Sequence, residues 1–419
     1  MNVQPMTAPG APVEHLHVRR HNLSLVLRML ATQGPMSRAG VASATGLTRA
    51  TVSSLTAELI ELGMVRELGL DADRRRGRPA TLLEIDGSHV VTIGVELNVG
   101  YLAVLGRDLG GRQVYDRRVV IDIGGIGDDR QRVDRVIFTL SRELADAIDV
   151  IQQDGRRVAG ITVAVPGVVD VERGTVRIAP NLGWQDVPIL ARLRPALSPR
   201  IVLDLDNESN LGAVAELRAG ALAGTANLVY VLAERGVGGG IVVDGTVLRG
   251  ATGAAGEIGH MTVQPVDGAR CGCGSLGCWE TQIGLFAMLQ RTLPTGAAAL
   301  LDDPQLDLRD QVAAIAVAAR SGDPVAIAGL REIAEWVGLG LANLIDVLDP
   351  EAVILGGTLH DLGELIIADV LDSVERNSLP GALDRCRVEI STLGFSAAAL
   401  GGAIHSAERL FSDPPLVAR

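Results

Sequence analysis

The feature that most limits the fold of this chain is a pattern of β-hairpin and helix that occurs twice. In the first copy, residues 89–121 predict three antiparallel strands, 132–153 a helix, and 158–170 a strand leading into a Pro-Gly turn. In the second copy, 226–250 predict two strands around a glycine-rich turn, and 333–357 a helix followed by a strand. Because each sheet needs helices to cover its apolar faces, the pattern predicts two α/β lobes of related fold with a cleft between them.

Charge is unevenly divided along the chain. The formal net charge is −12, yet residues 1–86 alone carry a net charge of +2. Only this N-terminal part is therefore suited to approach DNA. Aromatic residues make up 2% of the chain, which argues against single-stranded nucleic acid binding on stacked aromatic platforms. We expect residues 1–14, rich in Pro and Ala, to be disordered.

Cysteine use and hydropathy bear on the compartment. Three of the 4 cysteines fall within eight residues, which is not the disulfide framework of a small secreted domain. The sequence has no apolar stretch after a basic N-terminus and no run of about 18 apolar residues. We expect a cytoplasmic protein that does not contact a membrane.

The N-terminal segment has the spacing of a helix-turn-helix. Residues 21–34, 36–46 and 47–65 predict three helices, the second between Ser37 as N-cap and Gly46 as terminator. The third helix begins with short polar side chains and one arginine, which suit base edges and phosphates in a major groove. The predicted DNA-contacting residues of this segment are Ser37, Thr48, Arg49, Thr51, Ser53 and Ser54.

Residues 65–85 predict two strands around a polar tip. The tip carries Arg74, Arg75, Arg76 and Arg78, which could follow phosphates or enter a minor groove. A small helical bundle with a solvated arginine run is the alternative. The order of helices and strands resembles that of winged helix-turn-helix repressors, which implies a domain over 15–86 that binds double-stranded DNA.

One His and three Cys are grouped in the second half of the chain. His260, Cys271, Cys273 and Cys278 make a complete Cys3His set for tetrahedral zinc. No coordination position is left for an activated water, so the prediction is a structural zinc. A buried cluster of reduced thiols and a redox switch are the alternatives.

The motifs around this set carry a family resemblance. GEIGH (256–260) and CGCGSLGCWE (271–280) follow PGVVD (166–170), NLGW (181–184) and NESN (207–210). Together they resemble the ROK family of repressors, open-reading-frame proteins and sugar kinases, from about residue 88 to 412. The resemblance implies an actin-like, ribonuclease H-like α/β sugar-kinase fold behind a winged helix-turn-helix, which places the chain in the repressor branch. We assign the first lobe to 88–205 plus 395–412 and the second, with the zinc motif, to 206–394.

The resemblance also implies a sugar site. Carboxylates and amides suit adjacent hydroxyl groups of a polyol. His260 would serve both the zinc and the sugar, and zinc would fix the loop that bears Glu280. The residues that match the family's sugar-binding motifs are Gly167, Asn181, Asn207, Glu208, Glu257, His260 and Glu280.

The kinase motifs of the family are altered in this sequence. Glu208 occupies the position of the kinases' catalytic Asp, Asn98-Val99-Gly100 replaces a Gly-Gly-Thr phosphate turn, and Glu234-Arg235 replaces Gly-Thr before the glycine run 236–240. A carboxylate in a phosphate-binding turn repels phosphate. These changes predict a sugar sensor without catalytic residues, although the intact glycine run favours a kinase.

The sequence therefore predicts a sugar-responsive repressor of carbohydrate metabolism genes, a homodimer or homotetramer on a palindromic operator. The Asn-Glu pair at 207–208 resembles that of xylose-type repressors, which suggests xylose or another monosaccharide as effector. A sugar kinase with an added DNA-binding head and a regulator that binds no sugar are the alternatives. Whether the sugar releases or promotes DNA binding stays open.

Overall fold

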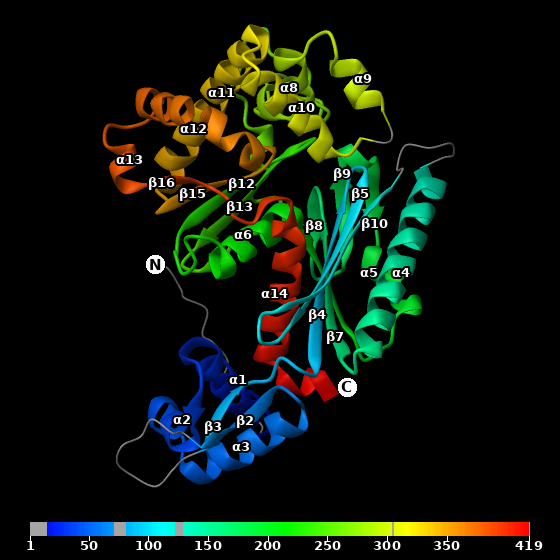
Figure 1. Cartoon of the computed structure of the whole chain (residues 1–419), viewed down its shortest axis with the longest axis vertical. Helices are drawn as coiled ribbons and strands as arrows, with labels where there is room; N and C mark the ends of the chain where they lie inside the picture. The colour runs from blue at the N-terminus through cyan, green and yellow to red at the C-terminus, as the bar shows by residue number, and fades with distance from the viewer. Residues whose placement is uncertain (1–14, 71–80, 122–128, 304–305, 419) are drawn as a thin grey trace, which may run out of the picture.

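The computed structural model describes residues 15–70, 81–121, 129–303 and 306–418. It has three parts along its long axis: an N-terminal head and two larger α/β lobes above it (Figure 1). The predicted arginine tip, Arg74 to Arg78, and the predicted disordered residues 1–14 lie outside the described ranges.

The head is a winged helix-turn-helix. Its helices are α1 (His15–Gln33), α2 (Arg38–Thr45) and α3 (Arg49–Glu61), and its strands β1 (Met36–Ser37), β2 (Val65–Leu70) and β3 (Thr81–Ile85) form a sheet in the order β1-β3-β2. Gly46, at φ 74°, turns the chain between α2 and α3. The Thr48 side chain accepts from the Thr51 N–H and so begins α3. The two strands of the predicted wing are confirmed.

The first lobe is a five-stranded sheet in the order β11-β7-β4-β5-β6. β4 (Val90–Asn98), β5 (Tyr101–Asp108) and β6 (Gln113–Val120) are antiparallel, as predicted, and β7 (Arg157–Val165) and β11 (Val202–Asn207) run parallel to β4. Helix α4 (Asp129–Gln153) covers one face. A small sheet of β8 (Val168–Asp170), β9 (Thr175–Ala179) and β10 (Trp184–Val187), followed by α5 (Ile189–Leu193), is inserted between β7 and β11.

The second lobe repeats this plan with the order β14-β13-β12-β15-β16. Its strands are β12 (Leu228–Ala233), β13 (Val237–Val243), β14 (Thr246–Val247), β15 (Ala352–Gly357) and β16 (Arg387–Ile390). Helices gather on one side of this sheet (Figure 1). They are α7 (Glu280–Ile283), α8 (Leu285–Thr292), α9 (Ala297–Asp302), α10 (Leu308–Arg320), α11 (Pro324–Leu348), α12 (Thr358–Asn377) and α13 (Ala382–Arg385).

Two helices cross between the lobes. α6 (Glu208–Ala219) starts where β11 ends, and α14 (Ala397–Ser412) packs against α6, β4 and β7. A Cβ on Gly401 would lie 1.7 Å from the Leu211 carbonyl oxygen, and one on Gly94 would lie 1.7 Å from that of Ala399. Helix α14 therefore touches the backbones of α6 and β4 directly. This close packing leaves α14 little room to move independently of these two elements.

The head shares a hydrophobic core with the body. Leu23 and Leu59 of the head belong to the same buried cluster as Leu410 of α14 and Val417, in the 3-10 helix η5 (Pro414–Ala418). Arg157 on β7 donates to the Leu62 carbonyl oxygen at 2.5 Å and also to that of Val417. The head is thus packed onto the end of α14, as Figure 1 shows in blue and red.

Among the described residues, no single helix is long and apolar enough to cross a membrane. Helices α10 and α11 together have that length and composition, but the pair is bent by 114°.

Candidate functional site

One cleft between the two lobes is lined by all seven predicted sugar-site residues. Gly167 follows β7 at φ 88°, and a Cβ there would lie 2.2 Å from the Ile178 carbonyl oxygen, so this turn requires glycine. A Cβ on Gly236 would lie 2.6 Å from Asn181 Nδ2 and 2.7 Å from Glu280 Oε2. Two predicted sugar ligands from different lobes therefore meet over the backbone of the glycine-rich turn.

Asn207 lines the cleft, but its side chain has a structural role that the sequence analysis missed. Its Oδ1 accepts from the N–H groups of Ser209 and Asn210, which caps α6, and its Nδ2 donates to the Gly167 carbonyl oxygen at 2.9 Å. With Oδ1 already engaged, the amide holds the turn and the helix together.

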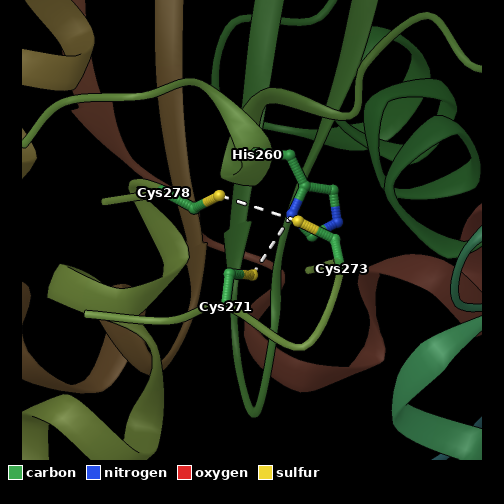
Figure 2. A group of neighbouring side chains, drawn as sticks. All are labelled: His260, Cys271, Cys273 and Cys278. Carbon is green, nitrogen blue, oxygen red and sulfur yellow. Dashed lines mark hydrogen bonds between the residues drawn. The ribbon is translucent and has the colours of Figure 1, made fainter. Parts of the chain in front are cut away.

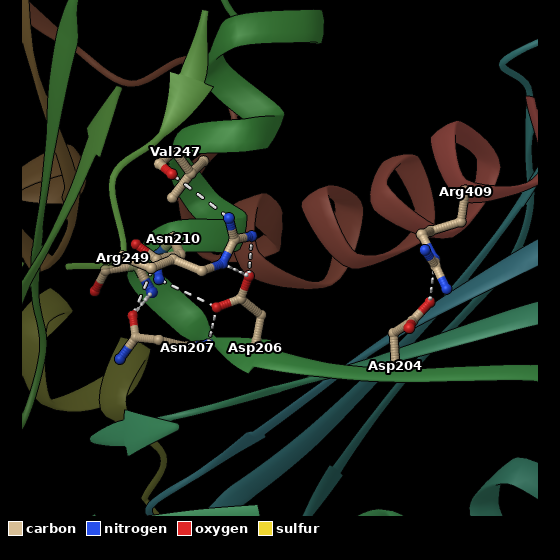
Figure 3. A network of polar contacts seen from close by, with 8 residues as sticks. Asp204, Asp206, Asn207, Asn210, Val247, Arg249 and Arg409 are labelled. Atoms are coloured by element: carbon tan, nitrogen blue, oxygen red, sulfur yellow. Dashed lines mark hydrogen bonds and ion pairs between the residues drawn. The ribbon is translucent and has the colours of Figure 1, made fainter. Parts of the chain in front are cut away.

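The neighbouring Asp206 holds the same end of β11 in place through contacts with Asn210 and Arg249 (Figure 3). It is 2% exposed and accepts from the Asn210 side chain at 3.1 Å and from Arg249 Nη2 at 2.5 Å. Arg249 follows β14 of the second lobe, so this ion pair between the buried Asp206 and the half-buried Arg249 connects the end of β11 to the segment that leads to Glu257.

Glu257, His260 and Glu280 form the second-lobe wall of the cleft. His260 Nε2 lies 3.7 Å from Glu257 Oε2, and burial raises the pKa of Glu257 above its ordinary value, opposed by His260. Glu280 Oε2 accepts from the Val237 N–H at 3.0 Å. Glu280 thereby connects the cysteine loop to the first residue of β13.

The four predicted metal ligands converge beside this wall (Figure 2). Their ligand atoms all lie within 4.8 Å of one another. Cys273 Sγ is 3.7 Å from Cys278 Sγ, and Cys271 Sγ is 3.6 Å from His260 Nδ1. Tetrahedral zinc with bonds of about 2.0–2.3 Å requires separations of about 3.6–3.8 Å. The residues fit a tetrahedral Cys3His site, with the other nitrogen of His260 facing Glu257 and the cleft.

Three carboxyl groups meet at the inner end of the cleft. Asn98 Nδ2 lies 2.7 Å from Glu234 Oε2, 2.9 Å from Glu208 Oε2 and 3.2 Å from Glu96 Oε1. The Tyr101 hydroxyl also donates to Glu96 and lies 3.3 Å from Glu234 Oε2. We call Glu96, Glu208 and Glu234 the carboxyl cluster; Asn98 and Tyr101 hold it together.

Burial and mutual repulsion keep protons on this cluster. Burial, followed by the charge on Glu96, raises the pKa of Glu234 to about 8. Burial, followed by the charges of Glu234, Glu96 and Glu257, raises the pKa of Glu208 well above its ordinary value. Burial also raises the pKa of Glu96. Protonated carboxyls can share hydrogens where three carboxylates would repel one another.

Arg118 supplies positive charge behind the cluster, and no sequence motif pointed to it. Its guanidinium stacks on the Tyr101 ring at 3.6 Å from the centroid, and Nε lies 3.5 Å from Asp307 Oδ2 at the start of α10. Burial raises the pKa values of Glu96 and Glu234, and the positive charge of Arg118 partly opposes that rise. It therefore joins β6 of the first lobe to α10 of the second.

The glycine run 236–240 is explained by packing. A Cβ on Gly238 would lie 2.4 Å from Ser209 Oγ, one on Gly239 2.5 Å from Ile258 Cδ1, and one on Gly240 2.2 Å from the Ser209 carbonyl oxygen. These contacts bring β13 against α6 and the turn at Ile258. The run is therefore required with or without a phosphate ligand, and its presence does not favour a kinase.

The predicted DNA-contacting side chains differ in exposure. Thr48, Arg49, Ser53 and Ser54 are exposed around the start of α3, and Thr51 is half-buried. Ser37 is instead 7% exposed, and its hydroxyl accepts from the Gly40 N–H as the cap of α2. The hydroxyl of Ser37 is thus engaged within the head, and a DNA contact by Ser37 stays a prediction.

Comparisons with known proteins cover both parts of the chain. The ROK family model matches residues 93–408, and the MarR family model matches residues 24–76. The chain is 31% identical over 395 residues to a protein named putative xylose repressor from a Caldicellulosiruptor species, covering 92% of this chain and 95% of that protein.

Solved structures agree with this division. A ROK family transcriptional regulator described as a homologue of the Escherichia coli Mlc protein superposes with a TM-score of 0.78 at 26% identity, over 96% of this chain and 98% of that one. A ROK family glucokinase from Streptomyces griseus, in complex with glucose and AMPPNP, gives 0.64 at 31% identity, over 75% and 99%. By family match and by fold, the chain belongs to the ROK family.

Proposed function

We propose that this protein is a transcriptional repressor whose affinity for a double-stranded DNA operator is set by a sugar bound between its two lobes. One observation carries the proposal: a helix-turn-helix head shares a continuous hydrophobic core with a sugar-kinase-like body in which carboxyl groups occupy the phosphate turns. The relatives named xylose repressors support the same combination.

The carboxyl cluster argues against phosphoryl transfer. Glu96 and Asn98 lie in the first expected phosphate turn, and Glu234 lies in the second. A nucleotide phosphate placed there would meet two buried acidic side chains, which fill the turns and take the place of the backbone N–H groups that bind phosphate. Glu208, at the position of the kinases' general base, is already engaged with Asn98. We infer that the body binds a sugar and does not phosphorylate it.

The sugar would be held from both lobes. Asn181 comes from the first lobe, and Glu257, His260 and Glu280 come from the second. Asn207 and Gly167 shape the floor, with Glu208 at the inner end. We propose that one monosaccharide ring occupies this cleft, with a xylose ring as the first candidate because of the relatives' names. Carboxylates and amides on several sides suit the hydroxyls of such a ring.

Zinc is the metal that fits the Cys3His ligand set. His260, Cys271, Cys273 and Cys278 would hold it, and with four protein ligands it would be structural. It would fix the cysteine loop, and through Glu280 the first residue of β13.

Helices α6 and α14 connect the cleft to the head. α6 begins at Glu208, α14 packs on its backbone at Gly401, and the end of α14 belongs to the core of the head. We propose that lobe closure around the sugar moves α6 and α14 together and thereby repositions the head. Two heads in a homodimer or homotetramer must match two half-sites, so this movement changes operator affinity, and the operator changes sugar affinity by the same factor.

The DNA-contacting surface would be the exposed N-terminal end of α3. Thr48, Arg49, Thr51, Ser53 and Ser54 are its proposed contacts. Arg74, Arg75, Arg76 and Arg78 lie outside the described residues and remain proposed contacts from the sequence alone.

Fluorescence anisotropy with DNA from upstream of the protein's own gene tests the function. We expect binding by the full chain and a change of affinity with at least one sugar from a panel of pentoses, hexoses and amino sugars. Binding that no sugar alters would contradict the sensor. ATP-dependent phosphorylation of a sugar would instead support the kinase alternative.

A further inference from the structure

A second cavity opens directly from the proposed sugar cleft. Its volume is about 390 Å³, which lies in the range of about 300–1,000 Å³ that ligand sites in proteins occupy. We call this cavity the vestibule. It shares six lining residues with the cleft: Gly167, Pro180, Glu257, His260, Gly272 and Cys273.

The two walls of the vestibule differ in chemistry. The wall from the small sheet β8–β10 is apolar, with Val168, Ile178 and Trp184, and Ile178 is 48% exposed. The opposite wall carries Glu257 and His260. A pyranose ring likewise has an apolar face of C–H groups and a rim of hydroxyls, so it matches both walls at once.

The inner end of the cleft leaves only outward directions for a longer ligand. Asn98 and the carboxyl cluster close that end with side chains already bonded to one another. A substituent on a sugar in the cleft must therefore point outward. Of the two cavities that adjoin the cleft, the vestibule has more lining residues in common with it. A second outlet, past Arg235 and Phe286, shares Arg235, Gly272 and Glu280 with the cleft.

We propose that the vestibule is a second sugar subsite and that the effector is a disaccharide. The inference rests on the proposed function, because the first ring must occupy the cleft. The second ring lies between β9–β10 of the first lobe and the cysteine loop of the second. The second ring therefore contacts both lobes. A disaccharide should then favour closure of the two lobes, in addition to binding more tightly than a monosaccharide.

Calorimetric titration of the full chain tests this with matched pairs: xylose and xylobiose, glucose and cellobiose, glucose and maltose. We expect one disaccharide to bind about tenfold or more tightly than its monosaccharide. Ile178→Trp fills the vestibule from an exposed position and should abolish that difference while leaving monosaccharide affinity unchanged. Val171→Trp, also exposed near the small sheet but outside the lining, is the control.

The outcomes separate the two ideas. Monosaccharides that bind as tightly as every disaccharide overturn the subsite and leave the sugar sensor standing. A disaccharide preference that survives Ile178→Trp but is lost in Phe286→Ala places the second ring in the other outlet and also overturns it. If no sugar of either length binds, the proposed function fails and the subsite fails with it.

Discussion

Asn98 Nδ2 lies 2.9 Å from Glu208 Oε2, so the residue at the kinases' catalytic position is hydrogen-bonded to a residue of the altered phosphate turn. The same amide reaches Glu234 in the second turn. The residues that differ from the kinase motifs are therefore joined by hydrogen bonds. Changing one of them back to the kinase residue leaves the others in place.

Glu208→Asp should not create a kinase. The shorter side chain leaves Glu96 and Glu234 in the phosphate turns, where they take the place of the backbone N–H groups that would bind a nucleotide phosphate. We expect no sugar-dependent ADP formation from the wild type or the variant in a coupled assay, with a ROK glucokinase as positive control. Sugar-dependent ADP formation by the wild type that Glu208→Gln abolishes would show an active enzyme.

The carboxyl cluster should make stability depend on pH. An acid whose pKa is about 8 in the folded protein and 4.5 in the unfolded chain takes up a proton on folding. The free energy of unfolding then falls as pH rises from 4.5 to about 8 and levels off above that range. Glu234→Gln keeps an acceptor for Asn98 and removes this titration. The free energy of unfolding of the variant minus that of the wild type should therefore be more than about 1 kcal/mol larger at pH 9 than at pH 5.

Thermal or urea unfolding at several pH values measures this effect. Glu332→Gln is the control, because Glu332 is an exposed partner of Arg291. Equal pH profiles for wild type and Glu234→Gln would mean that Glu234 is ionised in the folded protein.

Cys278→Ser should remove the metal and weaken sugar binding together. We expect about one zinc per chain in the wild type and loss of it in the variant. His260 and Glu280 then lose their fixed positions, and sugar affinity should fall by about 10- to 100-fold. Cys386→Ala changes a buried cysteine outside the ligand set and should retain both metal and sugar. Full sugar affinity in metal-free protein would separate the two sites.

Arg49→Ala and Ser37→Ala should have different effects. Arg49 is exposed at the first residue of α3, so its loss should lower operator affinity and reduce the slope of log affinity against log salt by about 1. Ser37 caps α2, so its loss should lower stability by about 1 kcal/mol. Anisotropy over a salt series and thermal unfolding distinguish the two. A reduced salt slope for Ser37→Ala at unchanged stability would instead show a DNA contact by Ser37.

Arg157→Ala should weaken communication between cleft and head. The guanidinium of Arg157 donates hydrogen bonds to the carbonyl oxygens of Leu62 in the head and Val417 in η5. A hydrogen bond from a charged donor contributes about 1.5–3 kcal/mol. Sugar affinity of the free protein should stay unchanged, while the ratio of operator affinities with and without sugar moves toward one. Arg200→Ala, an exposed arginine of the first lobe, is the control. An unchanged ratio would exclude this contact from the coupling.

The parts of the fold that follow from local pattern were predictable. Each of these features depends on residues that are close in sequence. They are the strands in 89–121, the caps at Ser37 and Gly46, and the spacing of the cysteines. The meeting of Asn98, Tyr101 and Arg118 with Glu234 was not, because four different strands or turns supply these side chains and only the tertiary fold brings them together. Asn207 as a helix cap could have been foreseen, since it directly precedes a helical pattern.

The core that the head shares with Leu410 and Val417 also sets an order for biosynthesis. N-terminal domains usually fold first as a chain leaves the ribosome. Here the residues that complete the head's core are made about 320 positions after the wing, so a growing chain has the helix-turn-helix long before it has the parts that stabilise it. We therefore expect the head to gain this part of its stability only after the body has been synthesised, and a truncated chain that lacks the body to hold an operator less firmly.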